Sequence, residues 1–127
     1  MKEPTSKKIL IIEDEKPLAH ALELKLTHEG FEVMTTSSGE EGIALLSKEK
    51  FALILTDLIL PGQDGFKVLE AIQNKKIKTP VIVMTNLNQE EDKKRATDSG
   101  ATNFFVKSNT TISEIVANVK AAADTSS

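Results

Sequence analysis

Six polar residues of this sequence follow apolar runs and are of types that bind metal ions or form hydrogen bonds. They are Glu13, Asp14, Glu15, Asp57, Thr85 and Lys107. Carboxylates that lie close together repel one another, so a cluster of them is tolerable when a divalent cation neutralises the charge. Hard oxygen ligands without histidine or cysteine suit Mg²⁺. The threonine and the lysine add a hydroxyl donor and an ammonium group.

Each of these residues also has an ordinary explanation when it is taken alone. Asp14 or Glu15 could cap a helix, Asp57 could sit in a turn, and Lys107 could be a solvated surface residue. The ordinary explanations fail only when the six residues are taken together, because a solvated sheet edge would not require this combination. The elements that carry the residues must therefore bring them together.

Five short apolar runs alternate with helical segments, which predicts a doubly wound α/β fold with five helices around a five-stranded parallel sheet. The expected strands cover residues 8–12, 31–35, 53–56, 81–85 and 103–106. The expected helices cover residues 17–29, 39–49, 65–74, 89–99 and 112–123. Two of these helices begin with the spacing of a capping box, Ser38 with Glu41 and Thr111 with Glu114.

The apolar content of the runs predicts the order of the strands. Residues 9–12, 53–55 and 81–84 are continuously apolar, as expected of strands that are buried on both faces, so strands one, three and four are central. The other two runs contain polar residues and suit the edges. With right-handed crossovers the order is 2-1-3-4-5, and ligands of such sheets bind at the carboxyl ends of strands one and three. The six polar residues should therefore converge there.

The composition is that of one folded domain, with 127 residues of which 39% are hydrophobic and 28% are charged. We expect the domain to cover residues 7–123, between flexible termini at residues 1–6 and 124–127. The absence of cysteine excludes disulfides and thiolate sites, and a net charge of −3 gives no electrostatic footprint for nucleic acid. No run approaches the roughly 20 apolar residues of a membrane-spanning helix, so we expect a cytoplasmic protein without membrane contact.

From about residue 8 to residue 119 the chain resembles the receiver domain of bacterial two-component response regulators, in particular stand-alone, chemotaxis-regulator-like ones. The resemblance rests on the acidic pair Glu13-Asp14, TDLILPGQDG around Asp57, VIVMTN around Thr85 and FFVKS around Lys107. It implies a flavodoxin-like fold and a phosphorylation-dependent switch that is not an enzyme, although it assists its own phosphorylation and slow autodephosphorylation.

The resemblance also implies a Mg²⁺ site. Asp14 would bind the ion directly and Glu13 mainly through water. Asp57 would be a further ligand, and the backbone carbonyl of Ile59 would complete the protein ligands.

For the phosphoryl group, the resemblance makes Asp57 the acceptor. Lys107 would neutralise charge on the transferring group, and Thr85 would hydrogen-bond a phosphoryl oxygen afterwards. Phe104 stands at the family's switch-aromatic position and would move inward into space that Thr85 vacates.

The implied partners are a cognate histidine kinase or phosphotransfer protein as donor and a downstream effector protein as target. An alternative is that the chain is a receiver domain excised from a larger response regulator or hybrid histidine kinase. A phosphatase with an aspartyl nucleophile would need a second aspartate at position 59, where Ile59 stands. A flavin mononucleotide carrier would need Trp or Tyr residues for stacking, and the sequence has neither. An interaction module that is never phosphorylated would not need the intact acids, threonine and lysine.

Two positions depart from the family pattern, and two others concern the hydrolysis of the phosphorylated state. Ser108 follows Lys107 where the family commonly has proline, so the loop after the fifth strand should differ. Asn86 stands after Thr85 where the family usually has a small residue, so it should narrow or polarise the access to the phosphoryl site. The resemblance implies that Ile59 and Leu87 flank the approach of water to the phosphoryl group, and their apolar side chains cannot align it for hydrolysis.

Overall fold

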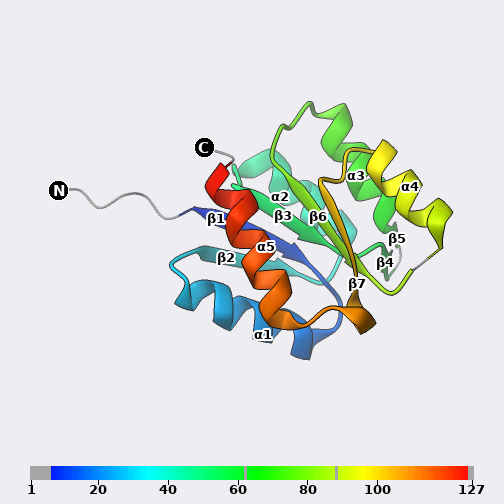
Figure 1. Ribbon diagram of the computed structural model, residues 1–127. Coiled ribbons are helices and arrows are strands. Elements are labelled where there is room, and N and C mark those ends of the chain that lie inside the picture. Colours follow the sequence, from blue (N-terminus) through cyan, green and yellow to red (C-terminus); the bar gives the residue numbers. More distant parts are fainter. Residues whose placement is uncertain (1–6, 62, 88, 126–127) are drawn as a thin grey trace.

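The computed structural model describes residues 7–61, 63–87 and 89–125. Its main sheet has five parallel strands in the order β2-β1-β3-β6-β7, which confirms the predicted order 2-1-3-4-5 (Figure 1). The strands are β1 (Lys8–Ile12), β2 (Glu32–Thr36), β3 (Leu53–Thr56), β6 (Val81–Thr85) and β7 (Asn103–Val106). Only the second strand differs from its expected bounds, by one residue at each end.

Helices cover both faces of this sheet, as the alternation of elements predicts (Figure 1). Ile9 and Ile11 of β1 point to one face and Leu10 and Ile12 to the other, because side chains alternate along a strand. The first pair packs with α1 (Lys16–His28) and α5 (Ile112–Thr125). The second packs with α2 (Gly39–Lys48), α3 (Gly65–Asn74) and α4 (Glu90–Asp98). In the described part of the chain no helix has the length and apolar character to cross a membrane.

The helix ends follow local sequence signals closely. Ser38 accepts the backbone N–H of Glu41 at 3.1 Å, and Thr111 and Glu114 cap each other reciprocally, as the capping-box spacing predicts. Helix α5 continues to Thr125, two residues beyond the expected end, so residues 124 and 125 of the expected flexible tail are helical. Residues 1–6 and 126–127 lie outside the described part of the chain.

Two short elements had no counterpart in the sequence-based prediction. An antiparallel hairpin of β4 (Ile59–Leu60) and β5 (Gln63–Asp64) connects β3 to α3, and a 3₁₀ helix, η1 (Lys107–Asn109), follows β7. Elements of two or three residues are too short for hydrophobic periodicity to reveal. The hairpin begins two residues after Asp57 and η1 begins at Lys107, so both elements fix the backbone beside candidate site residues.

Helix α3 begins in close contact with the segment that carries Asp57. The backbone N–H of Gly65 donates to the carbonyl of Leu58 at 2.9 Å. A Cβ atom added at Gly65 would overlap the carbonyl oxygen of Asp57 and the Cα atom of Leu58. Only glycine therefore allows this approach, and any larger residue must displace the backbone of the candidate site.

We expect Gly65→Ala to lower the free energy of unfolding by about 1–3 kcal/mol, because the added methyl group overpacks rigid backbone. Urea denaturation of the purified variant measures this loss. Glu70→Ala, an exposed change on the same helix, is the control and should stay within about 0.5 kcal/mol of the wild type. Equal stability of Gly65→Ala and the control would contradict the packing argument.

Candidate functional site

Backbone hydrogen bonds continue the sheet beyond its strands and place the first two acids. The N–H of Glu13 donates to the carbonyl of Thr36 at 2.9 Å, and the N–H of Asp57 donates to that of Ile12 at 3.0 Å. Glu13 and Asp57 therefore stand side by side at the carboxyl ends of β1 and β3. This is the edge where the strand order predicts a ligand site.

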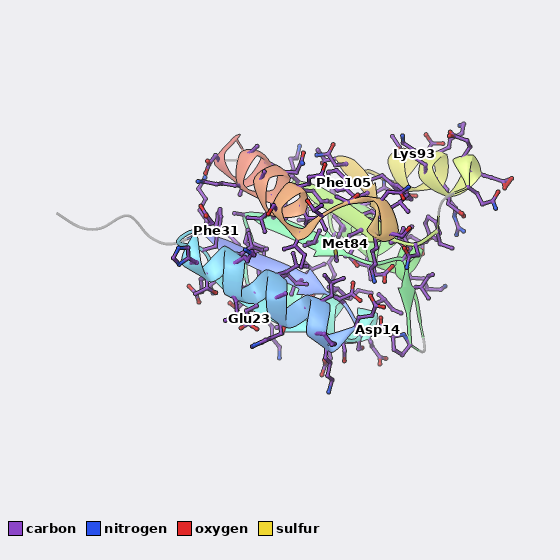
Figure 2. All side chains as sticks on the ribbon, turned by 60° about the horizontal axis from the view of Figure 1, so that its bottom comes forward. Asp14, Glu23, Phe31, Met84, Lys93 and Phe105 are labelled. Carbon is purple, nitrogen blue, oxygen red and sulfur yellow. The ribbon has the colours of Figure 1, made fainter. Side chains whose placement is uncertain are left out.

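Three carboxylates converge at this edge. Glu13, Asp14 and Asp57 each offer an oxygen, and these oxygens lie within 4.8 Å of one another. Glu13 and Asp57 are only 2% and 3% exposed, whereas Asp14 is exposed at the mouth of the site, between β1 and α1 (Figure 2). The cluster thus has a buried floor and one side chain that faces the solvent.

Asp57 is held in one orientation by three hydrogen bonds. Its Oδ1 atom accepts the backbone N–H groups of Leu58 at 2.6 Å and Ile59 at 3.1 Å. Its Oδ2 atom accepts from the Lys107 ammonium at 2.7 Å. Hydrogen bonds to ionised groups are the strong ones in proteins, so this carboxylate is positioned before any ligand binds.

Lys107 joins three acids that come from different parts of the chain. Its ammonium donates to Asp57 at 2.7 Å, to Glu15 at 2.9 Å and to Glu13 at 3.0 Å, and its side chain is only 10% exposed. Burial alone would lower the pKa of Lys107, but its hydrogen bonds with Asp57, Glu15 and Glu13 outweigh burial and raise that pKa. The lysine therefore stays charged at any physiological pH.

Glu13 is the most deeply buried of these acids. Its Oε2 atom accepts the backbone N–H of Glu15 at 2.9 Å. Its Oε1 atom lies 2.9 Å from the Lys107 ammonium but accepts no hydrogen bond from the described residues. Burial raises the pKa of this carboxyl, and the N–H of Glu15 and the ammonium of Lys107 oppose that rise. A buried carboxylate oxygen without a donor suits a cation, so the donor set fits Mg²⁺.

Thr85 and Asn86 lie at the end of β6. Thr85 is fully buried, and its hydroxyl oxygen accepts the N–H of Leu87 at 3.4 Å. The amide oxygen of Asn86 accepts the N–H of Ser108 at 3.1 Å, which ties the end of β6 to η1. All peptide bonds of the described residues are trans, including the one between Lys107 and Ser108.

Three apolar residues named by the resemblance surround this edge. Ile59 is 53% exposed and stands two residues after Asp57, at the start of β4. Phe104 and Leu87 are partly buried and pack against the core beneath α2, α3 and α4. Phe104 faces the same core layer as Ile54 and Val83, so it is part of the packing in this state.

The structure also reveals one partner that the sequence reasoning missed. Glu15 stood in the predicted acidic run but had no role of its own, yet it holds Lys107 from the exposed side. Its position in a run of three acids after β1 indicates that a cation lies nearby, because adjacent carboxylates need a compensating positive charge. Which lysine supplies that cation depends on the tertiary fold.

Comparison with known proteins identifies the family. Residues 9–120 match the model of the response regulator receiver domain. The cell cycle response regulators CtrA of Brucella ovis and Brucella abortus are each 39% identical over 100 residues, which are 79% of this chain and 43% of theirs. The chain thus spans less than half of the length of these relatives.

Solved structures show the same fold. The receiver domain of the Francisella response regulator 1452 superposes with a TM-score of 0.89 at 24% identity, over 96% of this chain and 100% of that one. A CheY-like response regulator receiver domain protein from Methanospirillum hungatei gives a TM-score of 0.88 at 25% identity, over 96% and 97% of the two chains. The chain therefore belongs to the response regulator receiver domain family of two-component signalling.

Proposed function

We propose that Asp57 accepts a phosphoryl group from a phosphohistidine of a cognate histidine kinase or phosphotransfer protein, and that this switches the surface presented to an effector protein. The observation that carries the proposal is the contact of Lys107 with both Asp57 and Glu13, inside a cluster of three carboxylates. A positive charge fixed beside an aspartate in this way favours the arrival of a negatively charged phosphoryl group.

The proposed reaction is an in-line displacement at phosphorus. An oxygen of the Asp57 carboxylate forms the new O–P bond while the P–N bond breaks, and the imidazole nitrogen keeps the electron pair. Because hydrogen bonds from Leu58, Ile59 and Lys107 already orient the carboxylate, little positioning entropy remains to be lost. The same donors would lie next to the oxygens of the arriving group.

Glu13, Asp14 and Asp57 would hold Mg²⁺, with the backbone carbonyl of Ile59 as a further ligand. Bound there, the ion supplies positive charge that offsets the negative charge of the transferring group and of its acceptor. Asp14 is the exposed member of the cluster and would be a direct ligand, and Glu13 would act mainly through water. The three carboxylate oxygens, which lie within 4.8 Å of one another, support a cation at this place.

After transfer, Thr85 would turn its hydroxyl to a phosphoryl oxygen, and Phe104 would move inward. Helix α4 suits the role of a responsive surface, because Ala96 is the only one of its residues that is buried. Arg95 links it to α3 through a cation–π contact, 3.9 Å above the ring centre of Phe66. Lys93 lies on the outer side of α4 (Figure 2). We propose that α4, β7 and α5 together form the output surface.

A domain of this kind would be a signalling switch, either on its own or as one part of a longer response regulator or hybrid histidine kinase. We further propose a cytoplasmic location, where a kinase could reach the site, and a domain that begins at residue 7 and ends with α5 rather than at residue 123. Ile59 stands where a phosphatase of the aspartyl type needs an acid, so turnover of external substrates is not proposed.

We expect Asp57→Asn to abolish phosphorylation, because an amide cannot attack phosphorus. Intact-mass spectrometry after mixing with acetyl phosphate and Mg²⁺ measures this, and omission of Mg²⁺ should also prevent the mass gain. Asp98→Asn, an exposed change on α4, is the control and should gain one phosphoryl group like the wild type. Continued modification of Asp57→Asn at the wild-type rate would refute the proposal.

We expect Lys107→Met to destabilise the Mg²⁺-free protein by about 3–5 kcal/mol at neutral pH, because it leaves the buried carboxylates without their cation. Urea denaturation measures this, and added Mg²⁺ should recover part of the loss. The matched control is Lys94→Met, which breaks an ion pair with Asp98 on the exposed face of α4 and should cost at most about 1 kcal/mol. Similar losses in the two variants would argue against a charge-balancing role for Lys107.

We expect the double variant Ile59→Asn with Leu87→Glu to shorten the half-life of the phosphorylated state by about tenfold, which needs only about 1.4 kcal/mol of better positioning of water. Polar side chains there can align water with the O–P bond, which Ile and Leu cannot. The decay of the phosphorylated mass with time, at fixed Mg²⁺, measures it. Leu24→Asn, an exposed change on α1, should leave the half-life unaltered. Unchanged or slower decay in the double variant would disprove the gating role.

A further inference from the structure

A hollow of about 500 Å³ lies at the end of the sheet opposite to Asp57. One side of it is formed by the end of α2 and the residues that lead into β3, and the other side by the segment that leads into β6. Its apolar floor comes from Leu46, Phe51 and Ile77. Its rim carries the exposed side chains of Lys48, Lys50 and Lys78.

The positive charge around this hollow is not balanced locally. Lys75 donates to Ser47 of the lining at 2.8 Å, and Lys76 directly precedes Ile77 of the floor, so five lysines gather here. The one acid of the lining, Glu49, is already ion-paired with Lys8. Within the described ranges, Lys48, Lys50, Lys76 and Lys78 form no ion pair. The chain as a whole has a net charge of −3, so this concentration runs against its average.

Helix geometry explains only part of the cluster. Lysines near the carboxyl ends of helices are favoured by the helix dipole, which accounts for Lys48 in the last turn of α2 and for Lys75 directly after α3. It does not account for Lys50 and Lys78, which lie beyond those helices in the connecting segments. A second explanation is therefore needed for the charge on the rim.

Lys76 gives an independent sign that charge is retained here at a conformational cost. Helices α1, α3 and α4 end in the same type of turn. In it, one backbone N–H donates to the carbonyl three residues earlier, and the next N–H donates to the carbonyl five residues earlier. At α1 and α4 the left-handed residue is Gly30 or Gly100, with φ near +100°, but at α3 it is Lys76, with φ +57°. A side chain at such a position is strained relative to glycine. Lysine nevertheless stands there, next to the hollow.

We propose that this hollow binds an acidic peptide segment of a partner protein, whose carboxylates pair with the lysines while one apolar side chain covers the floor. A small phosphate compound fits less well, because the hollow faces the carbonyl ends of α2 and α3 rather than a group of backbone N–H donors. The positive charges are also spread around an apolar surface, as suits an extended chain. This binding uses none of the residues at the phosphorylation site, so it does not depend on the function proposed above.

The test uses the full chain and a fluorescein-labelled peptide, Glu-Glu-Asp-Leu-Asp-Glu-Glu, in anisotropy titrations at low salt. We expect saturable binding by the wild type and by Asp57→Asn, and about tenfold weaker binding by Lys50→Glu with Lys78→Glu. The matched control is Lys67→Glu with Lys93→Glu, which reverses the same number of exposed charges on α3 and α4 and should bind like the wild type. In amide NMR spectra the peptide should shift Phe51 and Ile77 first.

Lys76→Gly separates binding from folding. Glycine relieves the left-handed strain, so the variant should unfold at a higher temperature than the wild type and yet bind the peptide more weakly. Replacing the central leucine of the peptide by serine should also weaken binding. No saturation at millimolar peptide, or equal weakening in the control variant, would overturn the proposal. Displacement of the peptide by equimolar pyrophosphate would overturn it in favour of a site for small phosphate compounds.

Discussion

The interaction on which this structure depends most is the contact of one ammonium group with carboxylates from distant parts of the chain. Lys107 is 94 residues from Glu13 and 50 residues from Asp57 in the sequence. It contacts both because β7 runs parallel to β1 and β3, so all three residues lie at the carboxyl ends of their strands. Two buried carboxylates at neighbouring strand ends would repel each other without this charge. The strand order, the η1 turn and the burial of the site must therefore form together.

The parallel arrangement of the sheet separates two kinds of chemistry to opposite ends of the molecule. Every strand of the main sheet ends on the same side, so the helices that follow begin on that side. The N-terminal ends of the helices carry partial positive charge, which favours the acids there. Their carboxyl ends lie at the opposite side, beside the lysines of the basic hollow. One topological choice thus gives an acidic end, where we propose phosphoryl transfer, and a basic end, where we propose a peptide site.

Much of this arrangement could be predicted from the sequence because burial leaves a direct trace in residue type. Continuous apolar runs such as Ile9 to Ile12 indicate strands covered on both faces, and they gave the strand order and the location of the site. The hairpin of β4 and β5 could not be found, because two-residue strands have no periodicity. The hydrogen bond from Lys107 to Glu15 depends on tertiary contacts, and the left-handed conformation of Lys76 depends on a backbone angle. Neither can be read from residue types.

The sparse burial of α4 has a consequence for how such a protein can diverge. Of this helix only Ala96 is buried in the core, and Arg95 adds a cation–π contact with Phe66, so most substitutions on α4 leave the core packing of the domain unchanged. The acids and the lysine at the strand ends, by contrast, share hydrogen bonds, so a change in one of them alters the interactions of the others. A duplicated gene could therefore acquire a new α4 surface within a few mutations while its chemistry stays fixed. Paralogues of this fold can therefore diverge in the surface of α4 without changes in the acids and the lysine at the strand ends.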